Sequence, residues 1–311
     1  MKKNYNLYTI FSDAISASDD IDFLHVPHGP SLKYRDTEEA SGRFHAVLES
    51  LGVMKGDRVV VQVEKSIESV LLYLACLRIG AIYIPLNTAY TPAEVSYFID
   101  DAEPRVFICD PVAHESLDSI LHNKVSQILS LSGNGTGSLV ELYNEMDAVN
   151  DIVHCSADDL AAILYTSGTT GRSKGAMLTH SNLSSNAQVL HQYWAFQPGD
   201  ILLHALPIFH VHGLFVALHC ALLNGSTIYF LPRFDANTVL QVLPVMHAVG
   251  KGYAVHLNIP SHVHVVTGIS YHHGLVSLQI KIGQDFFQHH GVRLGTCLVR
   301  AARYVEIMLQ T

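Results

Sequence analysis

The chain has 311 residues, of which 49% are hydrophobic and 15% are charged, and its formal net charge is −9. This composition excludes a disordered chain and leaves room for one large or two ordinary domains around a sizeable core. The acidic balance argues against a nucleic-acid partner, because no basic face compensates it.

In the first half of the chain, from residue 58 onward, the sequence predicts alternating strands and helices. A β-branched run predicts a strand over residues 58–63, and apolar residues at helical spacing predict a helix over residues 66–79, which Gly80 ends. Residues 81–84 form the next apolar run. This strand–helix–strand order predicts a parallel sheet covered by helices, and hence an α/β fold.

The next segment, Thr91-Pro92-Ala93-Glu94, has the composition of a helix start. Thr91 can cap the helix, Pro92 suits its first position, and Glu94 completes a capping box. We expect this helix to run to residue 101.

Further elements are expected downstream of this helix. A Gly- and Ser-rich surface loop is predicted over residues 130–138 and a helix over residues 182–194. The remaining predicted strands cover residues 106–109, 160–165, 176–178 and 226–231.

Between two of these strands lies the segment 165–175, Tyr-Thr-Ser-Gly-Thr-Thr-Gly-Arg-Ser-Lys-Gly. Its glycines let backbone N–H groups approach an anion, its hydroxyls add donors, and Lys174 adds a positive charge. This is the chemistry of a loop that holds nucleotide phosphates. The order differs from a Walker-type P-loop, because Ser173 precedes the lysine and Gly175 follows it. The alternative is a flexible surface loop of small polar residues.

The composition changes near residue 243. Residues 246–311 hold eight of the twenty histidines, and five Lys or Arg against two Asp or Glu, which is a local net charge of +3. Residues 1–245 hold fourteen Lys or Arg against twenty-six Asp or Glu, a net charge of −12. Helix and strand patterns are weak after the change, and no strand–helix unit is predicted there. The break indicates a different origin or a different constraint for this tail.

The order Thr-Ser-Gly-Thr-Thr-Gly-x-x-Lys-Gly in the loop resembles the signature of the adenylate-forming, or AMP-binding, enzymes, which include acyl-CoA synthetases and luciferases. Four other segments are similar to motifs of that family: residues 86–91 (Leu-Asn-Thr-Ala-Tyr-Thr), 158–165 (Asp-Asp-Leu-Ala-Ala-Ile-Leu-Tyr), 206–215 (Leu-Pro-Ile-Phe-His-Val-His-Gly-Leu-Phe) and 230–235 (Phe-Leu-Pro-Arg-Phe-Asp). Together the motifs most resemble the malonyl-CoA synthetase branch, and the resemblance covers residues 7–243.

The resemblance implies a fold and a reaction. The implied fold is the helix-flanked β-sheets of the large N-terminal domain of adenylate-forming enzymes, in incomplete form. The implied activity is an AMP-forming acid–thiol ligase, in which a small, malonate-like carboxylate attacks the α-phosphate of Mg-ATP. Coenzyme A, as co-substrate, would then displace AMP from the acyl-adenylate. ATP, Mg2+, coenzyme A and a small carboxylic acid are therefore the implied cofactors and partners.

The resemblance also implies roles for single residues. Hydroxyl groups and the lysine of the loop would hold the β- and γ-phosphates, while the glycines would let the backbone close around them. The predicted phosphate-loop residues are Thr166, Ser167, Gly168, Thr169, Thr170, Gly171, Lys174 and Gly175. His210, His212 and Gly213 would line the substrate pocket, and Lys174 and His210 are the predicted catalytic residues. The alternative for His210 is a hydrogen-bonded, half-buried histidine with a structural role.

Later motifs of the family are not recognisable in this sequence, among them the Tyr-Gly-x-Thr-Glu segment, the ribose-binding Asp and the catalytic lysine of the mobile C-terminal domain. We therefore predict a partial AMP-binding domain over residues 1–243 and a divergent His-rich tail over residues 244–311, with the C-terminal domain absent. No metal ligand is assigned.

Two other interpretations remain open. In the first, the chain is a truncated, non-catalytic fragment that keeps only the phosphate loop. Under either reading of its activity, exposed sheet edges or irregular packing and aggregation are expected around the tail, because the missing half of the family's domain supplies neighbouring strands. Alternatively the tail is a metal-binding module, although its spacings fit no standard zinc site. The histidines of that module would be His262, His264, His272, His273, His289 and His290.

Five cysteines are scattered along the chain without a Cys-x-x-Cys pair. Their odd number favours free thiols in a reducing compartment over a disulfide scaffold. Lys2 and Lys3 are followed by no continuous apolar run, so no signal peptide is expected. No uncharged apolar stretch reaches the length of about 18 residues that a membrane span needs. We expect a cytoplasmic protein without a membrane partner, and the sequence gives no signal for its oligomeric state.

Overall fold

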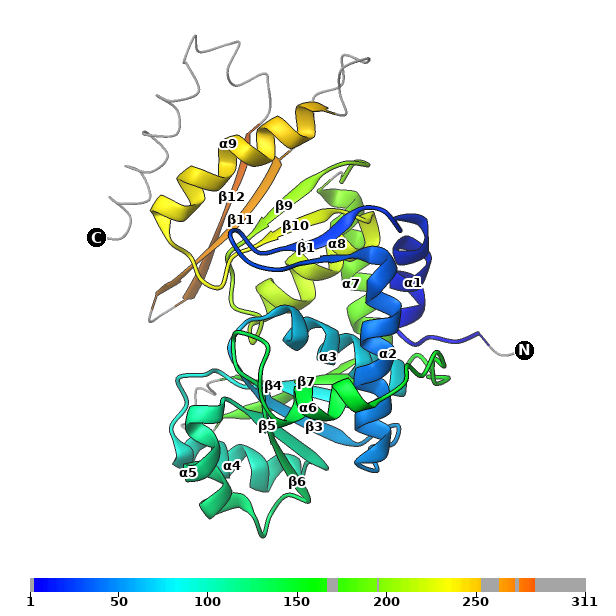
Figure 1. Ribbon diagram of the computed structural model, residues 1–311, viewed down its shortest axis with the longest axis vertical. Helices are drawn as coiled ribbons and strands as arrows, with labels where there is room; N and C mark the ends of the chain where they lie inside the picture. Colours follow the sequence, from blue (N-terminus) through cyan, green and yellow to red (C-terminus); the bar gives the residue numbers. More distant parts are fainter. Residues whose placement is uncertain (1–2, 167–172, 195, 253–262, 272–273, 283–311) are drawn as a thin grey trace.

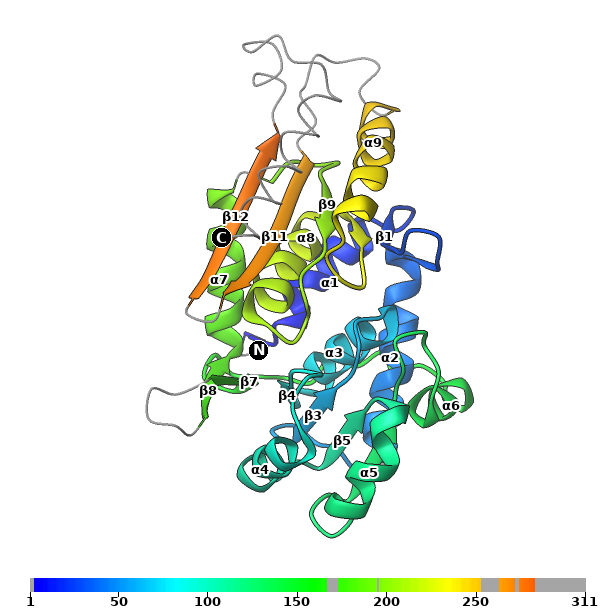
Figure 2. The ribbon, with the colours of Figure 1, turned by 90° about the vertical axis from the view of Figure 1, so that its left-hand side faces the viewer.

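The computed structural model describes residues 3–166, 173–194, 196–252, 263–271 and 274–282. Two six-stranded sheets organise these residues, with the first sheet above the second in Figures 1 and 2. The strand order is β12-β11-β9-β10-β1-β2 in the first sheet and β6-β5-β3-β4-β7-β8 in the second.

The strands of the first sheet are β1 (Asp22–His25), β2 (Ser31–Lys33), β9 (Ile201–His204), β10 (Thr227–Phe230), β11 (Val263–Tyr271) and β12 (Gly274–Ile282). Those of the second sheet are β3 (Arg58–Gln62), β4 (Ile82–Pro85), β5 (Val106–Cys109), β6 (Gln127–Ser130), β7 (Leu160–Thr166) and β8 (Lys174–Thr179). The helices are α1 (Tyr8–Ala17), α2 (Tyr34–Ser50), α3 (Ile67–Ile79), α4 (Pro92–Ala102), α5 (Pro111–Leu121), α6 (Ser138–Glu145), α7 (His180–Tyr193), the π-helix η1 (His212–Leu218), α8 (His219–Asn224) and α9 (Ala236–Gly252).

Neighbouring strands are parallel in the interior of both sheets. In the second sheet β3 pairs in parallel with β4 and β5, and only the edge strand β8 runs antiparallel, to β7. In the first sheet β10 pairs in parallel with β9 and β1, and β2 and β12 run antiparallel at its two edges. The prediction of an α/β fold built from helix-flanked sheets is thereby confirmed.

Helices cover both faces of the two sheets. Apolar side chains of α4 and α5 pack on one face of the second sheet, and α9 packs on one face of the first. The main hydrophobic core lies between the two sheets and takes residues from α1, α2, α3, η1 and α8 (Figures 1 and 2). The two sheets are therefore joined by a shared layer of helices.

The helix α3 lies in the middle of this shared core. Ser66 caps it in a capping box with Ser69, and Gly80 ends it in the left-handed conformation with φ of 72°. Nearly every one of its residues is buried, on all sides of the helix. A helix that is apolar all round is enclosed by protein, so α3 is a central element of the fold.

Several local predictions are confirmed. Thr91 and Glu94 form the expected capping box of α4, with the Thr91 N–H donating to Glu94 Oε2 at 2.8 Å. The Gly- and Ser-rich loop lies between β6 and α6, where the N–H groups of Ser130 and Ser138 each donate to the hydroxyl of the other residue.

The sequence did not predict the strands β11 and β12. They pair antiparallel with each other, and β11 adds in parallel to β9 at one side of the first sheet. The helix α9 crosses the predicted domain boundary at residue 243. The division of the chain at that residue stays a prediction.

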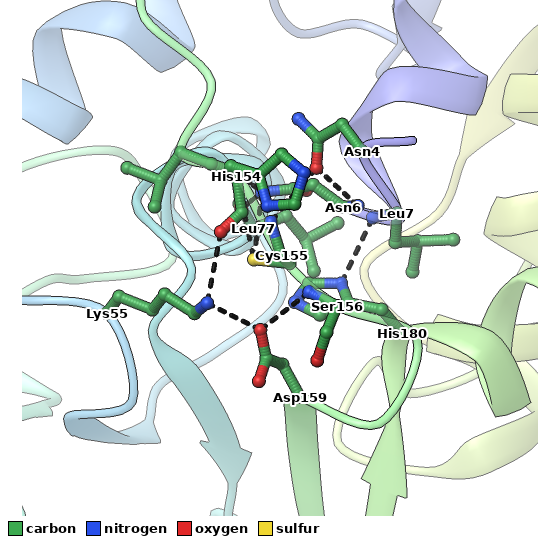
Figure 3. A network of polar contacts seen from close by, with 11 residues as sticks. Asn4, Asn6, Leu7, Lys55, Leu77, His154, Cys155, Ser156, Asp159 and His180 are labelled. Atoms are coloured by element: carbon green, nitrogen blue, oxygen red, sulfur yellow. Dashed lines mark hydrogen bonds and ion pairs between the residues drawn. The ribbon is translucent and has the colours of Figure 1, made fainter. Parts of the chain in front are cut away.

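A polar network ties the N-terminal segment to the base of the β7–β8 hairpin (Figure 3). The Asn6 side-chain amide donates to the Leu77 carbonyl at 2.6 Å, and the Leu7 N–H donates to His180 Nδ1 at 3.0 Å. Lys55 forms an ion pair with Asp159, just before β7 begins. These contacts fix the start of β7 and of α7, and so the base of the hairpin that carries the predicted phosphate loop.

Candidate active site

The described part of the predicted phosphate loop consists of its two ends. Thr166 ends β7 and Lys174 begins β8, and the two residues are paired across the antiparallel ladder. Tyr165 and Gly175 form the next pair. The hairpin therefore brings both ends of the loop together. The remaining predicted residues, Ser167, Gly168, Thr169, Thr170 and Gly171, lie outside the described residues.

Helix α4 anchors both ends of this loop. The Tyr165 hydroxyl donates to Asp101 Oδ2 at 2.6 Å, and the Tyr97 hydroxyl donates to the Ser173 carbonyl at 3.0 Å. The rings of Tyr165 and Phe98 lie 4.6 Å apart. Burial, followed by the hydrogen bond to the Asp101 carboxylate, raises the pKa of Tyr165, so the hydroxyl stays protonated and remains a donor.

The sequence did not predict the contacts of Tyr97 and Asp101, because they link residues more than sixty positions apart in the chain. Gly175 also has a role that the sequence did not indicate. A Cβ atom at this position would lie 2.8 Å from Ile163 Cγ2, so glycine permits the close packing of β8 on β7.

The second predicted part of the site is the segment 206–215, which we call the carboxylate-side segment. It follows β9 and leads into η1, so it begins at the carboxyl end of a parallel strand, where ligands bind in open α/β sheets. Gly213 is buried, and a Cβ atom there would overlap the Pro207 carbonyl oxygen. π-Helical turns such as η1 occur frequently at functional sites.

The two histidines of this segment lie at its turn into η1. His210 is exposed, and its ring packs 4.8 Å from the ring of Phe209. Partial desolvation, and then the nearby His212, lower the pKa of His210. A lowered pKa keeps the imidazole neutral at pH 7, so His210 offers both a hydrogen-bond donor and an acceptor.

Lys174 and His210, the two predicted catalytic residues, come from different sheets. Lys174 begins β8 in the second sheet, whereas His210 follows β9 in the first. Within the described ranges, no hydrogen bond or ion pair joins these two side chains.

A buried lysine behind the carboxylate-side segment was not predicted. Lys65 follows β3, and its Nζ lies 2.7 Å from His204 Nδ1 at the end of β9. His204 Nε2 lies 2.9 Å from the Gly213 carbonyl oxygen. The sequence did contain one signal for Lys65, because it places a lysine between a predicted strand and a predicted helix, at the carboxyl end of that strand.

The described residues also bear on the predictions of a metal site and of a membrane span. In those residues, no group of three or more His, Cys, Asp or Glu is placed to hold a metal ion. Of the paired histidines of the tail, only His264 lies in the described part, in β11. No helix among the described elements is long and apolar enough to cross a membrane.

Comparisons with known proteins agree with this fold. A family model described as AMP-binding enzyme matches residues 13–255. The crystal structure of ATP-bound MatB from Rhodopseudomonas palustris is 43% identical in sequence with a TM-score of 0.75, over 78% of this chain and 48% of that one.

Two sequence relatives represent different ligases. Malonate–CoA ligase ACSF3, mitochondrial, of Xenopus laevis is 37% identical over 234 residues, which is 74% of this chain and 36% of that protein. Long-chain-fatty-acid–CoA ligase FadD13 of Mycobacterium tuberculosis is 32% identical over 212 residues, which is 68% of this chain and 42% of that protein. The chain thus spans less than half the length of these relatives.

Proposed function

The chain belongs to the AMP-binding enzyme family, whose members here are AMP-forming carboxylate–CoA ligases, and we propose that it acts in the ATP-dependent ligation of a small, malonate-like carboxylate to coenzyme A. One observation carries the proposal. The β7–β8 hairpin and the carboxylate-side segment occur together in a chain that is 43% identical to an ATP-bound structure.

The proposed chemistry assigns a task to each part of the site. The phosphate loop holds the β- and γ-phosphates of ATP, and Lys174 supplies positive charge near the departing pyrophosphate. The carboxylate of the substrate attacks the α-phosphate, and AMP then becomes the group that the coenzyme A thiol displaces. Mg2+ supplies charge neutralisation on the triphosphate, and no side chain is assigned to it. Positioning and charge stabilisation dominate such reactions.

We assign the substrate carboxylate to the carboxylate-side segment. His210 and His212 lie at the turn into η1, and the neutral imidazole of His210 can donate a hydrogen bond to a carboxylate oxygen. Such polar groups suit a second carboxylate, as in malonate, better than a long apolar chain. A relative that is 37% identical is a malonate ligase, which supports the same choice.

A substrate panel tests this assignment. Acyl-adenylate formation is followed by hydroxylamine trapping with malonate, acetate, octanoate and 4-coumarate, each with saturating Mg-ATP. We expect malonate to give the highest kcat/KM. A preference for octanoate or 4-coumarate would refute the small-dicarboxylate proposal and leave the ligase proposal standing.

The alternative is a chain that binds polyphosphate without completing the reaction. The chain covers 48% of the ATP-bound relative, so the groups that complete the site in that protein need not all be represented here. Tripolyphosphate binding that depends on Lys174, together with no trapped acyl-adenylate for any acid, would favour this alternative.

The anchor between α4 and the phosphate loop yields a separate prediction. Tyr97→Phe removes the hydroxyl that donates to the Ser173 carbonyl. A lost hydrogen bond of this kind costs about 1 kcal/mol, so Mg-ATP affinity measured by calorimetry should fall about fivefold. Tyr193→Phe, at an exposed tyrosine on α7, is the matched control and should leave the affinity unchanged. Equal affinities for both variants would show that the anchor does not shape the loop.

We also propose a cytoplasmic location. Four cysteines lie in the described residues, and all four are buried free thiols, as expected of a protein kept in a reducing compartment. Fractionation of cells that produce the chain tests the location.

A further inference from the structure

We propose that Lys65 is a positioning residue for the carboxylate-side segment, acting through the ring of His204 on the carbonyl group of Gly213. The segment's role in holding substrate rests on the proposed function. The positioning itself is a property of the folded chain and can be tested without substrate.

The surroundings of Lys65 are unusual for a buried lysine. The residue is 7% exposed, and within the described residues no carboxylate lies at ion-pair distance from its Nζ. Nζ donates instead to the carbonyl oxygens of His204 at 2.8 Å and of Leu231 at 2.7 Å, and it lies 2.7 Å from His204 Nδ1. It also lies 4.1 Å from the centre of the Phe230 ring.

These contacts use the full donor capacity of an ammonium group. Three acceptors match its three N–H donors, and the face of an aromatic ring adds a cation–π contact. Burial lowers the pKa of Lys65 well below its ordinary value, and the three acceptors and the ring oppose that effect. Lys65 is therefore held by geometry and not by an opposite charge.

The hydrogen bonds of His204 have a fixed direction. The Gly213 carbonyl oxygen can only accept, so His204 Nε2 must carry the proton and donate to it. Nδ1 is then unprotonated and accepts from Lys65. Burial, and then the charge of Lys65, lower the pKa of His204 to about 3, so the ring stays neutral. Lys65 and the Gly213 carbonyl thus favour the same tautomer, and Lys65 holds the ring from its Nδ1 side.

Gly213 in turn fixes the turn that carries the two histidines. It lies in the first turn of η1 beside His212, and the Leu214 N–H donates to the His210 carbonyl at 3.0 Å. The close approach of Gly213 to Pro207 leaves no room for the turn to shift inward. A change at His204 is therefore passed to the backbone of the histidine turn.

The same lysine links the two sheets. Lys65 follows β3 of the second sheet, which also holds the β7–β8 hairpin, while its three acceptors lie at the carboxyl ends of β9 and β10 in the first sheet (Figures 1 and 2). It therefore sets the carboxylate-side segment relative to the sheet that carries the phosphate loop.

Substrate kinetics separate positioning from a merely structural role. In Lys65→Met we expect the KM for malonate to rise about tenfold, which corresponds to about 1.4 kcal/mol, with the KM for ATP within twofold. His204→Gln keeps an N–H that can reach Gly213, so its KM for malonate should stay near the parent value. His204→Leu should show the same rise in this KM as Lys65→Met. Lys124→Met removes an exposed ion pair with Asp100 and is the matched lysine control. A uniform loss of kcat in all variants, or equal changes in both KM values, would overturn the proposal.

A measurement on the unmodified chain keeps the proposal testable if a variant does not fold or the chain is inactive. Nitrogen-15 spectra of histidine-labelled protein should show His204 as the neutral Nε2–H tautomer from pH 7.5 to pH 5. In folded Lys65→Met, the His204 Nδ1 signal should shift because that atom loses its donor, and the His210 and His212 signals should shift with it. An Nδ1–H tautomer in the parent chain, or unchanged spectra in Lys65→Met, would overturn the positioning role. Absence of acyl-adenylate would overturn only the proposed function.

Discussion

Lowering the pH from 7 to 5 should reduce the free energy of unfolding by about 3–6 kcal/mol, because three fully buried histidines remain neutral in the folded chain. Burial lowers the pKa of His180 to about 4, and of His204 and His219 to about 3 each. His219 packs against the rings of Phe11 and Tyr73, which explains its desolvation.

The direction of this pH effect follows from the number of protons bound by the folded and the unfolded chain. In the unfolded chain each of these histidines titrates near its ordinary pKa of about 6.5. Between that value and the folded-state pKa the unfolded chain binds more protons, so stability falls as the pH falls through this window. The carboxyl group of Asp159 titrates at a lower pH than these histidines. Its hydrogen bond from Lys55 lowers its pKa to about 2, so its contribution is lost only below about pH 4.

Urea unfolding at pH 7.5, 6.5, 5.5 and 5 measures the effect. The slope of the free energy of unfolding against pH should correspond to about two to three protons taken up on unfolding near pH 5. His219→Gln should reduce that number by about one, whereas His122→Gln, at an exposed position, should leave it unchanged. A slope that corresponds to fewer than one proton would contradict the claim that the three buried histidines stay neutral in the folded chain.

Replacing Gly213 by Ala should destabilise the chain by about 3 kcal/mol and abolish carboxylate activation. The added Cβ atom would overlap the Pro207 carbonyl oxygen and lie 3.3 Å from Leu206 Cβ. Because both obstacles belong to the backbone or its first side-chain atom, the turn itself must move. That movement carries the Gly213 carbonyl away from His204 and displaces the histidine turn.

Gly56→Ala is the matched control for this variant. Gly56 has a φ of 85°, and a Cβ atom there would meet nothing within 4 Å, so alanine costs only about 1 kcal/mol of backbone strain. Denaturant unfolding of both variants gives the comparison. If Gly213→Ala costs no more than Gly56→Ala, the turn is not held against Pro207.

Local signals predicted much of the second sheet. A β-branched run located β3, and the Thr91–Glu94 capping box located the start of α4. Such features depend on residues close together in the sequence. The chain order of these elements was also enough to predict parallel pairing and helix-covered faces.

Other features depend on contacts between distant residues and could not be read from local pattern. β1 pairs with β10, where Leu24 lies opposite Ile228, and no element before residue 58 was assigned from the sequence. The strands β11 and β12 lie in a segment with weak periodicity. Lys65 and His204 are 139 positions apart, so their link is visible only once β3 and β9 are placed in space.

Only part of the candidate site was predicted from the sequence. The loop composition located the β7–β8 hairpin, because glycines, hydroxyls and a lysine in one short segment carry their chemistry locally. Tyr97 and Asp101, which position this loop, had no local signal of that kind. Lys65, which positions the carboxylate-side segment, had only its place between a predicted strand and a predicted helix. The phosphate-binding and catalytic roles of the predicted residues remain proposals.

ATP–pyrophosphate exchange tests the proposed reaction most directly, because it reports adenylate formation without coenzyme A. The purified, folded 311-residue chain is incubated with malonate, Mg-ATP and labelled pyrophosphate, beside Lys174→Ala and a sample without acid. We predict malonate-dependent exchange that falls at least about a hundredfold in Lys174→Ala, as expected when a group that stabilises transition-state charge is lost. No malonate-dependent exchange from the folded parent chain would contradict the proposal that it activates a small carboxylate.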